Sequence, residues 1–354
     1  LNKLHPEATL TVRHLQVRTK TLFTPLKTYV PINGLPGYIL TESPEGTFAA
    51  DTRLQRESEY FFNYVQPAYG MEVLNRYFNS SNPGLYQKFR ELNGSFLENL
   101  EDYGIVNVEN VRKEMEDLLQ VYEDLENYRN AIYSRYTKLP DTIPARVRDL
   151  ALNLVMNEQT TYAKVQALEK YLRSNFTYTL RPDVPPEDQD FVDYFMFEGK
   201  EGYCSYFASV LFVLVRAAGI PARFVEGFVM PDKHDENGFY HVTNQYAHAW
   251  VEVYLEGVGW VTFEPTPPYA GVMNYFVSLQ EFEGTGYYQE LPPEIPDQYQ
   301  YMRRELPDDF VFINNGKNEF RTVTVLLWAG AGILALLLLN LIGALLHQQK
   351  RQNA

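Results

Sequence analysis

The stretch that decides the fold begins with GYCSYFASVLFVLVRAAGIP (202–221) and continues with QYAHAWVEVYL (245–255) and GWVTFEPTPP (259–268). It contains, in this order, the thiol of Cys204, the imidazole of His248 and the carboxylate of Glu264. We expect each of the three on a different secondary-structure element. In cysteine nucleophile sites a carboxylate orients an imidazole, and the imidazole activates the thiol. The order of these residues therefore predicts a site of that kind.

Residues 205–218 are predicted to form a buried helix. The segment is apolar on nearly every side and has no helix breaker, whereas Gly219 and Pro221 are typical of a helix end. Cys204 is thereby placed in the first turn, where unpaired backbone N–H groups lower the pKa of a thiol and can stabilise an oxyanion. A lone cysteine is more often a small buried apolar residue, but that alternative fits the middle of a helix better than its first turn.

The other two residues of the predicted site are expected on a β-hairpin. Residues 247–254 alternate like a strand, residues 260–263 form a second strand, and the segment between them has the length and glycines of a hairpin turn. Such a hairpin would bring Glu264 next to His248. The carboxylate would then bind one ring nitrogen and leave the other for the thiol.

The motifs of this stretch resemble the bacterial transglutaminase-like superfamily over about residues 145 to 270. The resemblance rests on GYCS-x-x-A (202–208), LVRAAGIPAR (214–223), GF (227–228), HAWVEV (248–253) and GWV-x-FEPTP (259–267). It implies a papain-like α+β core with Cys204 as the nucleophile, His248 as the general base and Glu264 as the third member. The family usually has Asp at this third position, so this chain carries one more methylene there.

The reaction that this resemblance implies is acyl transfer on protein or peptide carboxamides through a thioester on Cys204. Resolution by an amine would make the protein a transglutaminase, whereas resolution by water would make it a cysteine peptidase or amidase, and the superfamily contains both. A catalytically weak binding or scaffold domain is a further alternative. Tyr203, Gln245 and Trp250 are near enough in sequence to bind substrate, and neither a metal nor another cofactor is required.

A metal site is a rival interpretation of the histidines. It would combine His234, Asp235, His241 and His248. Their spacing matches no familiar zinc pattern, and His234 and Asp235 lie in a polar segment expected to be solvated. The sequence therefore favours the nucleophile site.

The composition is that of a folded, acidic protein. The chain has 354 residues, of which 45% are hydrophobic and 15% aromatic, with 31 basic against 45 acidic residues and a net charge of −14. Disordered chains are poor in aromatics, and nucleic-acid-binding proteins normally show a basic face, so both classes are excluded. One cysteine excludes an intramolecular disulfide, and the sequence does not define an oligomeric state.

Changes in periodicity divide the chain into six predicted regions. They are a β-rich N-terminal region (1–78), a helical region (79–144), the transglutaminase-like catalytic domain (145–280), a linker (281–321), a transmembrane helix (322–346) and a basic tail (347–354). Helices are expected over 111–136 and 161–174, and a strand over 176–180. The Pro- and acid-rich segment 181–201 is predicted to be a loop that lines a substrate cleft. The fold class is therefore α+β with one C-terminal transmembrane helix.

The membrane prediction rests on residues 323–346, which contain no charged residue and consist mostly of Leu, Ala, Val, Ile and Gly. About 20 apolar residues suffice for a helix that crosses a lipid bilayer. A large domain before the span and a short basic tail after it favour the domain outside and the tail inside. Together with the resemblance, this predicts a bacterial cell membrane location with an extracytoplasmic catalytic domain. The chain starts at Leu1 rather than Met, so we expect a fragment of a longer protein.

Overall fold

The computed structural model describes residues 7–28, 31–43, 46–65, 72–100, 108–231 and 233–270. The predicted linker, transmembrane helix and basic tail lie outside these ranges, and they stay predictions. Within the described ranges, no helix is both long enough and apolar enough to cross a membrane.

The N-terminal part is β-rich, as expected. Strands β1 (Glu7–Arg13) and β4 (Glu59–Val65) form one antiparallel pair, and β2 (Leu40–Glu42) and β3 (Phe48–Ala50) form another. They enclose a small core of their own, made of Leu22, Phe48, Ala50, Leu54, Tyr60 and Phe62. The β-rich region was predicted to extend to residue 78, but helix α1 (Glu72–Ser80) already begins inside it. Leu74 and Phe78 lie one helical turn apart on the same face of this helix, and both side chains pack into the main core.

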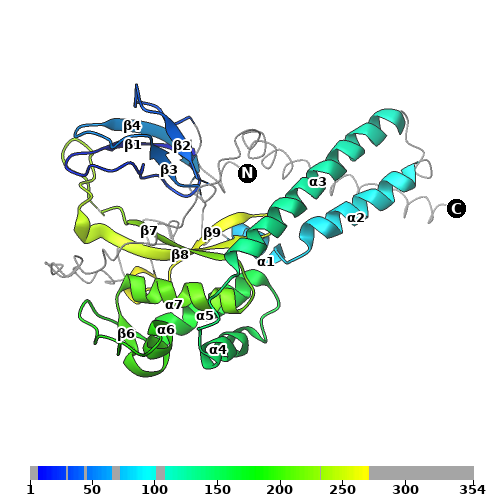
Figure 1. The fold of residues 1–354 in the computed structure, drawn as a ribbon. Helices are drawn as coiled ribbons and strands as arrows, with labels where there is room; N and C mark the ends of the chain where they lie inside the picture. Colours follow the sequence, from blue (N-terminus) through cyan, green and yellow to red (C-terminus); the bar gives the residue numbers. More distant parts are fainter. Residues whose placement is uncertain are drawn as a thin grey trace. The chain divides into compact units, whose positions relative to one another are not determined.

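Two long helices follow, α2 (Leu85–Glu98) and α3 (Val108–Tyr136), which lie side by side (Figure 1). The rings of Phe89 and Tyr122 stack with centroids 5.9 Å apart, and Arg90 pairs with Glu126 at 3.1 Å. The helical periodicity predicted α3 correctly, and the structure extends it by three residues at its start.

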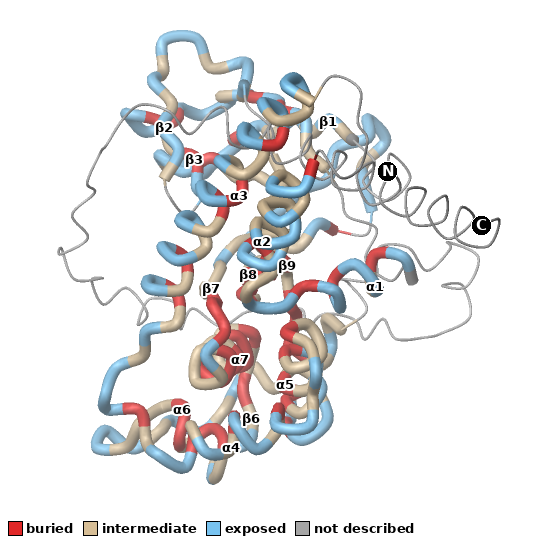
Figure 2. Tube along the Cα trace, turned by 90° about the vertical axis from the view of Figure 1, so that its right-hand side faces the viewer, coloured by how far each residue is buried: buried red, intermediate tan, exposed pale blue. Residues whose placement is uncertain are grey.

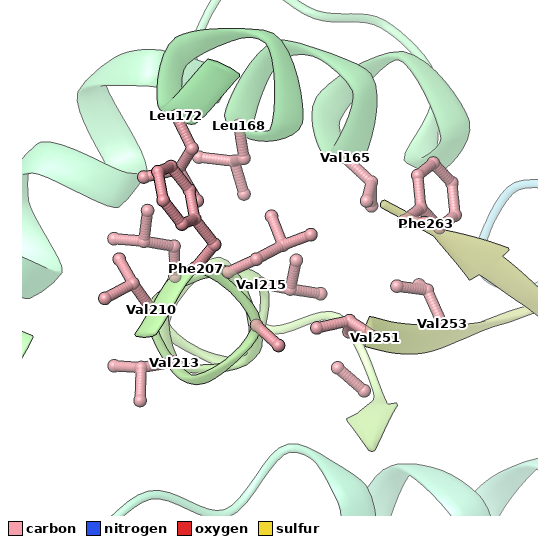
Figure 3. Close-up of a cluster of buried hydrophobic side chains, with 14 of the residues drawn as sticks. Val165, Leu168, Leu172, Phe207, Val210, Val213, Val215, Val251, Val253 and Phe263 are labelled. Atoms are coloured by element: carbon pink, nitrogen blue, oxygen red, sulfur yellow. The ribbon is translucent and has the colours of Figure 1, made fainter. Parts of the chain in front are cut away.

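The main core lies between helices and a three-stranded antiparallel sheet (Figures 1 and 2). The helices are α4 (Ala145–Val155), α5 (Thr161–Asn175) and α7 (Cys204–Ala217), and the strands, in the order β7-β8-β9, are Ala222–Phe228, Ala247–Leu255 and Gly259–Phe263. Helix α7 is the buried centre, in contact with β7, β8, α4 and α5. Figure 3 shows Val165, Leu168 and Leu172 of α5 turned toward α7 and the sheet. Helix α5 and the sheet thus pack around α7, which begins with Cys204.

The predicted hairpin is confirmed. Strands β8 and β9 pair from Leu255↔Gly259 to Val251↔Phe263. Gly257 and Gly259 adopt φ values of 83° and 91°, a backbone region that favours glycine and explains its use in this turn. Strand β7, which the periodicity did not single out, pairs with the other edge of β8 and sets Gly227 opposite His248.

The segment predicted as a long loop over 181–201 is in part helical. Helix α6 (Phe191–Tyr194) continues into a π-helix (Phe195–Gly199), and strand β6 (Glu201–Gly202) pairs in parallel with β5 (Thr177–Tyr178). The loop interpretation was wrong here because Phe195 and Met196 are buried in the main core. The strand predicted over 176–180 is reduced to the two residues of β5.

Candidate active site

Cys204 is the first residue of α7 and is buried, as the prediction of a first-turn thiol requires. The chain enters this helix through Gly202 and the extended Tyr203. A Cβ atom on Gly202 would lie 2.6 Å from the Cβ of Tyr206, closer than side-chain atoms approach. Glycine at position 202 therefore lets the first turn of α7 pack against the entering chain. This close packing fixes the position of Cys204 at the start of the helix.

His248 and Glu264 meet across the open end of the β8–β9 hairpin. His248 is the second residue of β8, and Glu264 directly follows β9. Nε2 of His248 lies 2.6 Å from Oε2 of Glu264, and both side chains are buried. The second oxygen, Oε1, accepts the backbone N–H of Thr266 at 2.8 Å. The extra methylene of glutamate thus still allows the contact that orients the imidazole.

The pKa of His248 is the net result of opposing influences. Burial lowers this pKa. The charge and hydrogen bond of Glu264 and the nearby Cys204 raise it by more than burial lowers it, so that the pKa is about 9. At neutral pH the ring is therefore an imidazolium paired with a buried carboxylate. An imidazolium can donate a proton to a leaving group.

The second ring nitrogen, Nδ1, remains for the thiol. It is buried and has no hydrogen bond of normal geometry within the described residues. The Cys204 thiol is nevertheless near enough to influence the ring's pKa by hydrogen bonding and by charge. The thiol therefore faces the imidazole without the alignment of an ideal hydrogen bond.

Aromatic rings flank the imidazole. The ring of Tyr269 lies on His248 with centroids 4.0 Å apart, and the ring of Trp250 stacks at 6.3 Å. Trp250 and His248 are two residues apart on β8 and share one face of the strand. Gly227 makes room for the indole, because a Cβ there would lie 2.6 Å from a ring carbon of Trp250.

Two residues of α5 that the sequence analysis did not select hold the backbone of Glu264. Oε1 of Glu169 accepts the Glu264 N–H at 2.8 Å, and Nε of Arg173 donates to the Glu264 carbonyl at 2.7 Å. A signal was present, since position 169 follows Leu168 on the apolar face of the helix. A carboxylate on such a face is unusual without a partner.

The three predicted substrate-binding residues are placed differently. Tyr203 immediately precedes Cys204 and contacts Tyr206, with ring centroids 4.7 Å apart. Trp250 flanks His248, whereas Gln245 is exposed in the short 3₁₀ helix Asn244–Tyr246 that leads into β8. Their binding of substrate stays a prediction.

The rival metal set is not assembled. His241 binds Asp235 at 2.9 Å in an exposed loop, while His248 binds Glu264. Over the described ranges, no three His, Cys, Asp or Glu side chains gather in a way that could hold a metal ion.

Known proteins are similar to part of this chain. A family model described as Transglutaminase-like superfamily matches residues 148–265. The Uncharacterized protein YebA of Bacillus subtilis (strain 168) is 46% identical over 157 residues, which are 43% of this chain and 21% of that protein. A Protein-glutamine gamma-glutamyltransferase of Pseudomonas aeruginosa is 35% identical over 133 residues, which are 37% of this chain and 20% of that protein. The match thus spans about a fifth of each curated relative.

A solved structure agrees with the fold. The periplasmic domain of TgpA from Pseudomonas aeruginosa superposes with a TM-score of 0.52 at 20% identity, covering 77% of this chain and 76% of that one. At this identity the likeness bears on the fold alone. Residues 148–265 thus match the model of the transglutaminase-like superfamily, and the fold of this solved structure agrees with that match.

Proposed function

We propose that this protein is a cysteine-dependent acyltransferase that forms a thioester between Cys204 and the side-chain carbonyl of a protein-bound glutamine. The observation that carries the proposal is the buried His248–Glu264 hydrogen bond of 2.6 Å beside a thiol at a helix start. The relative from Pseudomonas aeruginosa named Protein-glutamine gamma-glutamyltransferase supports glutamine as the acyl donor.

The first half-reaction would proceed as follows. His248 already carries the proton as an imidazolium, so the sulfur of Cys204 attacks the carboxamide carbon as the thiolate of this ion pair. The oxyanion that forms lies near the start of α7, where the first backbone N–H groups of a helix have no intrahelical acceptor. The imidazolium then protonates the departing nitrogen, the C–N bond breaks, and ammonia leaves behind a thioester.

The second half-reaction would restore the starting pair of Cys204 thiolate and His248 imidazolium. A primary amine attacks the thioester carbon, His248 takes a proton from the attacking nitrogen, and the C–S bond breaks to give an isopeptide bond. Glu264 would keep the imidazole in one orientation and stabilise its charge throughout. Water in place of the amine would give deamidation, and a peptide bond in place of the glutamine amide would give proteolysis.

One experiment distinguishes these outcomes. The full chain is incubated with a glutamine-containing protein, with and without a fluorescent primary amine, and amine incorporation, ammonia release and peptide cleavage are measured for wild type and Cys204→Ala. We expect amine incorporation that Cys204→Ala abolishes. Ammonia release or cleavage without incorporation would assign the hydrolytic alternative. No activity, together with iodoacetamide labelling of Cys204 no faster than that of a free thiol, would leave the scaffold interpretation.

We further propose that the domain works outside the cytoplasm, attached to the membrane through residues 323–346. The solved relative is described as a periplasmic domain. The apolar composition of residues 323–346 supports the attachment. Partition of the full chain into membranes, with residues 148–265 accessible to protease from the outer side only, is the expected result.

A further inference from the structure

The orientation of Glu264 depends on a backbone that has already left the sheet. The β8–β9 ladder ends at the pair Val251↔Phe263, one residue before Glu264. Strand pairing therefore does not set where the Glu264 side chain starts. A glutamate side chain rotates about three bonds, so a small shift of its backbone would move the carboxylate away from His248.

Two side chains of α5 replace the sheet at this point. Glu169 accepts the Glu264 N–H at 2.8 Å, and Arg173 donates to the Glu264 carbonyl at 2.7 Å. Glu169 and Arg173 are one helical turn apart and bind each other at 2.9 Å. The three residues thus close a ring of hydrogen bonds that holds both polar atoms of the Glu264 main chain.

The helix that supplies these side chains is fixed to the nucleophile helix. Val165, Leu168 and Leu172, on the same face of α5, pack into the core around α7 (Figure 3). A displacement of Glu264 relative to Cys204 would therefore require either the hydrogen-bonded ring or this apolar contact to break. Helix α5 acts as a common support for the nucleophile and for the carboxylate that orients its base.

We propose that Glu169 and Arg173 are positioning residues, which set the orientation of the Glu264 carboxylate, and through it of His248, by holding the Glu264 backbone. The role in turnover rests on the proposed function, but the effect on the Cys204–His248 pair does not. An exposed ion pair one turn apart on a helix would contribute little to stability. This pair differs because it is largely buried and binds the main chain of a residue that contacts the imidazole.

The ionisation of Glu169 makes this positioning role depend on pH. Burial raises the pKa of Glu169 to about 7, with a further rise from the Glu264 charge, whereas Arg173 and the Glu264 N–H lower it. Tyr162, on the same helix, also faces Glu169, and its own pKa is raised to about 12, so it stays neutral. The ionised Glu169, which is the better acceptor, is thus lost as the pH falls below about 7.

The test compares Glu169→Ala with Glu169→Gln in the full chain. The alanine removes the acceptor, and we expect kcat to fall by about 10- to 100-fold with KM nearly unchanged, since misplacement on the scale of 1 Å has that effect. The glutamine oxygen can still accept both N–H groups, so kcat at pH 8 should stay within about threefold of wild type. Because glutamine does not titrate, any loss of activity near pH 7 that Glu169 causes should disappear in this variant.

Glu256 provides a matched control at the opposite end of the same hairpin. Its buried carboxylate also accepts two backbone N–H groups, from Gly84 and Tyr86, and pairs with Arg129 at 3.3 Å. Glu256→Ala should lower the stability of the fold without changing kcat. An equal loss of kcat in Glu256→Ala and Glu169→Ala would show a general loss of stability and overturn the proposal.

A second readout separates this proposal from the proposed function. The rate at which iodoacetamide labels Cys204 is measured against pH, which needs no substrate. We expect a changed profile in Glu169→Ala and a nearly wild-type profile in Glu169→Gln and Glu256→Ala, even if wild type turns over no glutamine. Should Glu169→Ala not fold, Arg173→Lys takes its place, because a lysine cannot bridge both oxygens with a planar fork. Unchanged kcat and an unchanged labelling profile in these variants would refute the positioning role.

Discussion

Both carboxylate oxygens of Glu264 are in use, one 2.6 Å from Nε2 of His248 and the other accepting the N–H of Thr266 at 2.8 Å. This double engagement leaves the carboxylate one orientation. It also explains how a glutamate serves at a position where the resemblance leads one to expect aspartate. The main chain is set for the longer side chain, since Glu169 and Arg173 hold the Glu264 peptide groups on either side.

The first prediction is that Glu264→Asp does not raise the proposed activity. Shortening the side chain by one methylene withdraws the carboxylate from His248, and the held backbone does not follow. We expect kcat for amine incorporation to fall by about 10- to 100-fold, the cost of misplacing a catalytic group by about 1 Å. Activity equal to or above wild type in Glu264→Asp would contradict this account.

The second prediction concerns the alkaline limb of activity. In the proposed mechanism the His248 imidazolium protonates the leaving nitrogen, so kcat/KM of wild type should decline above a pKa of about 9. Glu264→Gln keeps the shape but removes the charge that raises this pKa, so the decline should begin at lower pH. The measurement is kcat/KM for amine incorporation from pH 6 to pH 10.5. An alkaline limb that stays in place would show that Glu264 does not set the protonation of His248.

Sequence reasoning could reach the order and local placement of this site. The helix that begins at Cys204 is predictable because Gly219 and Pro221 mark the end of an unbroken apolar run, and the β8–β9 hairpin because two glycines stand in its turn. These are local signals, in which backbone preference and periodicity act over a few residues. They placed Cys204 at the start of a helix, His248 on the first strand of the hairpin and Glu264 at the end of the second, which agrees with the structure.

What the sequence could not supply are contacts between distant segments. Glu169 binds the Glu264 N–H across 95 positions, and no local pattern encodes that pairing. The segment 181–201 shows the opposite case, because its prolines and acids favour a loop. Burial of the apolar side chains of Phe195 and Met196 in the core nevertheless stabilises helical turns in this segment.

The third prediction links the pKa of His248 to stability. In the folded state this pKa is raised from 6.5 to about 9, so the proton binds the folded protein more tightly than the unfolded chain. The resulting stabilisation is fully present below about pH 6.5 and is lost as the pH rises through about 9, a change of roughly 3 kcal/mol. Urea unfolding of wild type and His248→Gln at pH 6 and pH 10 measures it.

The comparison with His248→Gln isolates this effect. Glu169 also has a raised pKa, but its contribution falls away between about 4.5 and about 7 and is common to both proteins. The free-energy difference between wild type and variant should therefore be larger at pH 6 than at pH 10. The same difference at both values would mean that the imidazole has no raised pKa in the folded state.

The last prediction uses two glycines in opposite surroundings. A Cβ at Gly227 would lie 2.6 Å from a ring carbon of Trp250, so Gly227→Ala must displace the indole beside His248. We expect a loss of about 1–3 kcal/mol of stability from this overpacking, together with a higher KM because Trp250 is a predicted substrate contact. Gly94, inside α2, has nothing within 4 Å of its ideal Cβ, so Gly94→Ala should stabilise the protein by about 0.5–1 kcal/mol through helix propensity. Urea unfolding and substrate titration of both variants give the comparison. Equal effects of the two substitutions on stability and KM would show that the position of the Trp250 indole does not depend on the absence of a side chain at position 227.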